Sequence, residues 1–111
     1  MVVDQLSEPE VDRLFHALAD STRRSIVLRA ISEEHSVSAL AAHYAMSFAA
    51  VQKHVAVLEQ ASLVTKEKRG REQMVRANRE TVRKARQLLD EYEQIWRQRV
   101  DRITEILAED E

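Results

Sequence analysis

The chain has 111 residues, of which 44% are hydrophobic and 32% charged, with one Gly, one Pro and a formal net charge of -2. This composition fits one mainly helical domain with little sheet, and the absence of cysteine excludes disulfides, thiolate metal sites and thiol nucleophiles. Because nothing resembles a secretion signal or approaches the roughly 18 apolar residues of a membrane span, we expect a cytoplasmic protein without a membrane partner.

Two helices are predicted at the start of the chain. The first begins near Pro9, and its apolar side consists of Val11, Leu14, Phe15 and Leu18. After ADSTRR, any of three polar residues can cap a second helix: Asp20, Ser21 or Thr22. This helix extends to about residue 31, and its apolar positions are Ile26, Val27, Ala30 and Ile31. The following SEEHS is predicted to be a polar loop.

Residues 38–60 are predicted to form two helices joined by a tight turn. Ser38 can cap the first, SALAAHYA, and Ser47 can cap the second. In the second helix Val51, Val55 and Leu58 recur at i, i+4 and i+7, which is typical of a buried helix face.

The opposite face of this second helix carries mostly small and polar side chains, namely Phe48, Ala49, Gln52, Lys53 and Ala56. Such a face can enter a DNA major groove about 12 Å wide, where Gln52 can pair with an adenine edge and Lys53 can reach guanine or a phosphate. Ser47 and the helix N-terminus can hold a phosphate. His54 lies beside the buried stripe, so a boundary role and a phosphate contact are both open. The alternative for this face is simple exposure to solvent.

Residues 64–77 are predicted to form a β-hairpin around Gly70, the only glycine. Positive charge is concentrated here: residues 36–76 hold six Lys or Arg against three acids, whereas residues 1–35 hold four against seven and residues 77–111 hold seven against nine. The hairpin cations predicted to contact a DNA backbone or minor groove are Lys66, Lys68, Arg69 and Arg71. A hairpin tip that only improves solubility is the alternative. For Arg23 and Arg24 the sequence favours ion pairing or helix-start surface over phosphate contact.

Residues 79–109 contain no helix breaker and predict one helix of about 45 Å. Its apolar residues follow steps of three and four, interrupted at Arg99 beside Val100. A domain this small cannot cover such a helix, so we predict a dimer contact through Leu89, Tyr92, Trp96, Ile103 and Ile106. The alternative is that this stripe, which starts at Val82 and Ala85, only covers the domain's own core.

The order helix, helix, helix-turn-helix, hairpin, long helix resembles the winged helix-turn-helix of the ArsR/SmtB family of bacterial transcriptional repressors. Three segments carry the resemblance over nearly the whole chain: LFHALADSTRRSIV, MSFAAVQKHVAVLEQASLV and VTKEKRGREQMVRA. The sequence has Ala49 where the family often has Pro, Gln52 where it often has Ser, and Ser62 where it often has Gly. The first two departures lie on the predicted reading face and therefore concern the operator sequence more than the fold.

The resemblance implies a mainly α winged helix-turn-helix domain, residues 1–111, that forms a homodimer through its terminal helices and represses transcription at a palindromic operator, with its own gene among the candidates. The ending YEQIWRQRVDRITEIL resembles the branch that lacks metal sites. Family metal sensors use Cys near the third helix or Asp and His on the last helix, but this chain has no Cys and no His after His54. Its four histidines lack helical pair spacing, so we expect no metal and no other cofactor.

No nucleophile and base motif or Gly-rich phosphate loop is recognisable, so an enzyme is not expected. The sequence thus predicts a regulator that binds double-stranded DNA as a homodimer. The alternative is a winged-helix module that binds a protein partner without sequence-specific DNA contact. A small organic ligand, a partner protein or protein abundance are all compatible as the signal for DNA release.

Overall fold

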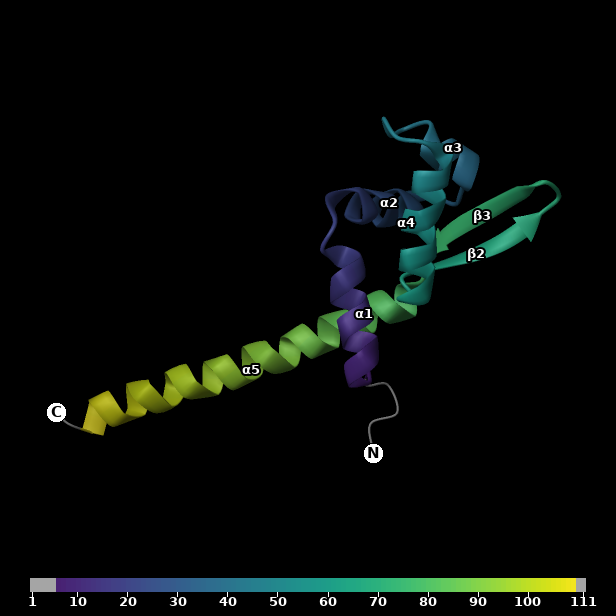
Figure 1. The fold of residues 1–111 in the computed structure, drawn as a ribbon. Coiled ribbons are helices and arrows are strands. Elements are labelled where there is room, and N and C mark those ends of the chain that lie inside the picture. Colours follow the sequence, from purple (N-terminus) through teal and green to yellow (C-terminus); the bar gives the residue numbers. More distant parts are fainter. Residues whose placement is uncertain (1–5, 110–111) are drawn as a thin grey trace.

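The computed structural model describes residues 6–109, which form five helices and a small antiparallel sheet. The elements in chain order are α1 Glu8–Leu18, α2 Ser21–Ser32, β1 His35–Ser36, α3 Val37–Ala41, α4 Phe48–Gln60, β2 Val64–Arg69, β3 Glu72–Ala77 and α5 Arg79–Glu109. Figure 1 shows that the hairpin of β2 and β3 projects from one side of the helical body, while α5 extends far beyond the body on the other side. The mainly helical fold with a small hairpin agrees with the prediction.

Short polar side chains fix the starts of the first two helices. Ser7 and Glu10 form a capping box at α1, in which each side chain accepts a hydrogen bond from the other residue's backbone N–H. Of the three candidate caps of α2, Asp20 is the cap, because its carboxylate accepts a hydrogen bond from the backbone N–H of Arg23 at 3.0 Å.

The third helix differs from the prediction at both ends. Its cap is Ser36 and not Ser38, since the Ser36 hydroxyl accepts a hydrogen bond from a first-turn backbone N–H at 3.0 Å. The helix also ends at Ala41 and does not continue to Ala45. Val37, the first residue of the helix, is buried, so the cap lies two residues earlier than the polar pattern indicated. In the structure the two helices of the helix-turn-helix therefore lie within residues 37–60.

The polar segment 32–36, predicted to be a loop, contributes a third strand. His35 pairs with Val75 and Ser36 with Met74, and the sheet order is β1-β3-β2. The hairpin itself turns at Gly70, whose φ of +61° suits a residue without a Cβ. Two residues are too few to show an alternating pattern, so pairing with the central strand β3, of which Val75 is buried, decides that β1 forms.

The end of α4 is a Schellman turn. The backbone N–H of Leu63 donates to the carbonyl of Leu58 at 3.0 Å, and that of Ser62 donates to the carbonyl of Glu59 at 2.9 Å. Ser62, where the family often has Gly, adopts a φ of +60°. Both leucines are buried, so the turn joins α4 to β2 through the core.

One hydrophobic core lies between α1, α2, α3, α4 and the sheet. Its buried residues are Leu14, Ala17, Ile26, Val27, Ala30, Val37, Leu40, Val51, Val55, Leu58, Ala61, Leu63, Val64 and Val75. Two residues predicted on buried faces are instead exposed, Phe15 by 44% and Ile31 by 56%. The stripe that α1 buries is centred on Leu14 and Ala17, so Phe15 lies beside it. Among the helices of residues 6–109, α5 included, none is suited in length and apolarity to span a membrane.

Candidate nucleic-acid interface

One face of α4 is buried and the opposite face is free. Its buried residues are Val51, Val55 and Leu58. Their packing turns Phe48, Ala49, Gln52 and Lys53 toward solvent. Within residues 6–109 no hydrogen bond or ion pair involves the side chains of Gln52 or Lys53, so both are available to a ligand.

The N-terminus of α4 is also exposed. Ser47 caps it by accepting a hydrogen bond from the backbone N–H of Ala50 at 3.1 Å. The hydroxyl of Ser47 can still donate its own proton, and the remaining first-turn N–H groups carry the positive end of the helix dipole. This end of α4 can therefore accept an anionic oxygen.

His54 lies between the exposed and the buried face of α4. Its Nδ1 is 3.3 Å from a guanidinium nitrogen of Arg23 and 4.0 Å from a carboxylate oxygen of Asp20. Arg23 donates to two carbonyls at the end of α1, at 2.8 and 2.9 Å, and Arg24 donates to a third at 2.7 Å. Both arginines thus complete the hydrogen bonding of the α1 C-terminus, and the contacts of His54 favour the boundary role over the phosphate contact.

The hairpin cations differ in their partners. Lys66 is 3.7 Å from a carboxylate oxygen of Glu59 on α4, which ties the base of the hairpin to the helix. Lys68 and Arg71 are exposed and form no ion pair with any residue of the described range 6–109. They are therefore the tip cations that are free to meet a phosphate.

Arg69, predicted to contact DNA, is held by two carboxylates. Its guanidinium binds both oxygens of Glu34, one of them at 3.0 Å, and an oxygen of Glu67 at 3.1 Å. These hydrogen bonds, first to Glu34 and then to Glu67, raise the pKa of Arg69 above its usual value. Glu34 also pairs with Arg76 at 3.5 Å. No sequence pattern predicts this cluster, because only the sheet order brings residue 34 near residue 69.

The apolar stripe of α5 starts on the body and continues beyond it. Thr81 is buried and Ala85 packs against the core, whereas every residue from Leu89 to Glu109 is exposed. The predicted dimer residues have exposed fractions between 49% and 62%; they are Leu89, Tyr92, Trp96, Ile103 and Ile106. The uncovered stripe therefore extends along most of the helix.

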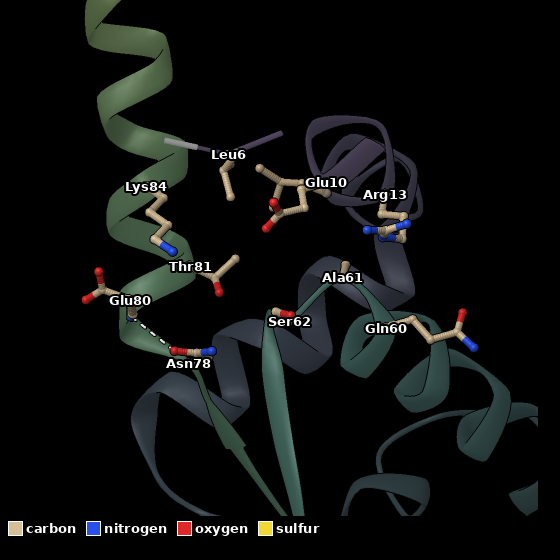
Figure 2. Close-up of a pocket in the computed structure, with 11 residues that line it drawn as sticks. Leu6, Glu10, Arg13, Gln60, Ala61, Ser62, Asn78, Glu80, Thr81 and Lys84 are labelled. Carbon is tan, nitrogen blue, oxygen red and sulfur yellow. Dashed lines mark hydrogen bonds between the residues drawn. The ribbon is translucent and has the colours of Figure 1, made fainter. Parts of the chain in front are cut away.

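A pocket of about 280 Å³ lies where α1, the end of α4 and the start of α5 meet. Figure 2 shows Lys84 and Thr81 of α5 and Glu10 of α1 around it. At its rim Asn78 accepts a hydrogen bond from the backbone N–H of Glu80 at 3.2 Å, which starts α5. The lining has two basic and two acidic side chains and so no net charge. Within residues 6–109 no group of three or more His, Cys, Asp or Glu residues is arranged to hold a metal ion.

A helix-turn-helix with an exposed second helix beside a β-hairpin defines the winged helix-turn-helix class. An ArsR-like transcriptional regulator from Rhodococcus sp. RHA1 is similar, with 32% identity, a TM-score of 0.81 and coverage of 88% of this chain and 90% of that chain. A "possible transcriptional regulator for arsenical resistance" has 37% identity, a TM-score of 0.66 and coverage of 73% and 83%. The chain belongs to the ArsR family of transcriptional regulators.

A more distant structure shows the same fold. It is the winged helix-turn-helix DNA-binding domain of a possible ArsR-family regulator from Mycobacterium bovis, described as homodimeric, with 24% identity, a TM-score of 0.63 and coverage of 76% of this chain and 82% of that chain. No family model and no curated protein matches the sequence.

Proposed function

We propose that the protein is a DNA-binding transcriptional repressor that occupies a palindromic operator as a homodimer. The observation that carries this proposal is the exposed face of α4, where Gln52 and Lys53 have no partner within residues 6–109, next to the free hairpin cations Lys68 and Arg71. In Figure 1 the hairpin leaves the body beside α4, as the pair between Lys66 and Glu59 requires. Helix and hairpin can therefore contact one duplex together.

Each exposed side chain of α4 suits a different DNA group. Gln52 can exchange two hydrogen bonds with an adenine edge, and Lys53 can reach the acceptors of guanine or a phosphate. Phe48, which is 47% exposed, can make an apolar contact with a thymine methyl group. Ala49 allows the backbone to approach the bases, and Ser47 with the helix N-terminus can bind a phosphate.

The homodimer follows from the uncovered stripe of α5. A helix that leaves apolar side chains exposed over roughly its last six turns needs a partner, and a second copy offers the same stripe in a self-complementary contact. A two-fold dimer presents two α4 helices, and such pairs read half-sites about 34–36 Å apart. Repression follows where this complex occupies a promoter.

Footprinting of the full chain on the DNA upstream of its own coding region tests the proposal. We expect two symmetric protected segments related by a dyad, and lower transcription from that promoter in vitro when the protein is added. Weak protection without sequence preference would instead support the module that binds a protein partner. Increased transcription from a protected promoter would refute repression while leaving DNA binding intact.

A further inference from the structure

The two arginines that flank the hairpin turn are not equivalent. Arg71 has no ion-pair partner within residues 6–109, whereas Arg69 is bound by Glu34 and Glu67. Both belong to the same exposed tip, and each is one residue from Gly70. From sequence position alone, both arginines are expected to reach DNA equally well. Only the carboxylates of Glu34 and Glu67, which bind Arg69, distinguish the two.

Glu34 is well placed to hold Arg69. It immediately precedes β1, and β1 lies on the far side of the central strand from β2, so the guanidinium of Arg69 reaches back across the sheet toward the body. Glu34 is the less exposed partner, with 23% of its side chain exposed against 49% for Arg69. It also binds Arg76 of β3, so its carboxylate is fixed between two cations. A fixed carboxylate with paired oxygens matches the planar guanidinium better than a mobile surface acid does.

We propose that Glu34 withholds Arg69 from DNA: the ion pair persists in the operator complex, and the phosphate contacts of the hairpin tip come from Arg71 and Lys68. A carboxylate and a phosphate oxygen compete for the same guanidinium hydrogens. Glu34 is therefore a positioning residue that sets affinity and salt dependence without touching DNA. This inference rests on the proposed DNA-binding function.

The number of phosphate contacts can be measured from the salt dependence of the operator-binding affinity. Each contact adds about 0.9 to the slope of log affinity against log salt, so one contact per protomer adds about 1.8 in a dimer. We expect Arg71→Ala to lower the slope by up to about 1.8, and Arg69→Ala to leave it unchanged. Glu34→Gln leaves only Glu67 to hold Arg69, so it should partly release Arg69. The slope should then rise by up to about 1.8, and binding at 0.1 M salt should tighten by up to roughly 60-fold.

The double variant of Glu34→Gln with Arg69→Ala separates release of Arg69 from the loss of one negative charge near DNA. We expect the double variant to lose the gained slope and affinity. Glu72→Gln is the matched control, since it removes an acid of the same tip that forms no ion pair within the described residues. It should leave the slope unchanged. Thermal unfolding of each variant confirms that the fold is kept.

Three results would overturn the inference: no change of slope in Glu34→Gln, a gain that persists without Arg69, or a lower slope for Arg69→Ala in the otherwise unchanged protein. The last result would mean that Arg69 exchanges Glu34 for phosphate on binding. Failure of the proposed function looks different, because the unchanged protein would then show no operator preference and Arg71→Ala would not alter its salt dependence.

Discussion

Replacement of Trp96 by alanine tests the proposed dimer contact of α5. Trp96 lies in the middle of the uncovered stripe and has an exposed fraction of 62%. An indole offers up to roughly 250 Å² of surface, so about 150 Å² is available to a partner. At about 25 cal/mol per Å², full cover of that surface contributes about 4 kcal/mol per protomer.

Only part of this hydrophobic free energy appears as binding free energy, because the ordering of side chains at an interface opposes it. With half retained, Trp96→Ala costs about 2 kcal/mol per protomer and about 4 kcal/mol per dimer, which raises the dimer dissociation constant roughly a thousand-fold. We therefore expect sedimentation velocity over a dilution series to shift from dimer to monomer. Operator affinity should fall with it, since a single protomer reads only one half-site.

Gln94→Ala is the control for this measurement. Gln94 is exposed on the same helix but lies two residues, or about 200° around the axis, from Trp96. It should leave the dissociation constant unchanged. Equal behaviour of the two variants, or a monomeric unchanged protein that still binds both half-sites, would refute the assignment of this stripe to the dimer.

Three further predictions concern single side chains of the body. Gln52→Ala should relax base preference at one position per half-site, measured on an operator mutant set, and should cost about 1–3 kcal/mol of DNA-binding free energy. Gln60→Ala, at the far end of α4, should change neither. Equal base preference in the two variants would contradict the role of Gln52. Ser62→Gly should raise the free energy of unfolding by about 0.5–1 kcal/mol, because glycine accepts the positive φ without a Cβ clash, and Ser62→Ala in the same urea titration should bring no gain. The pKa of Asp20 is lowered, first by the hydrogen bond from the Arg23 N–H and then by the nearby charges of Arg23 and His54. The ionised Asp20 carboxylate therefore contributes fully to the free energy of unfolding above the usual aspartate pKa, and this contribution is lost as the pH falls through the lower folded pKa. Asp20→Asn keeps the cap but does not titrate, so its urea midpoint should decline less steeply below about pH 4 than that of the unchanged protein; identical declines would exclude this linkage.

The helical parts of the fold could be predicted because their signals are local. The spacing of Val51, Val55 and Leu58 identifies the buried face of α4 and, by exclusion, the face that carries Gln52 and Lys53. The single glycine marks the hairpin turn, and α5 has the predicted bounds because residues 79–109 contain no breaker. Each of these features depends on neighbours within a few residues along the chain, and the side chains that make them are all visible in sequence.

Tertiary structure alone decided which charged residues remain free. Sequence treats Arg69 and Arg71 as equals, but the strand order brings Glu34 within hydrogen-bonding distance of Arg69 across 35 positions and leaves Arg71 without a partner among residues 6–109. In the same way, packing of α2 against α4 places Arg23 beside His54. Ion pairs form between side chains that the fold brings together. The spatial distance between two residues far apart in the sequence cannot be predicted from periodicity or local propensity. The sequence therefore determined the elements and the face that we propose reads DNA, whereas the arrangement of those elements in space determined which charged side chains remain unpaired.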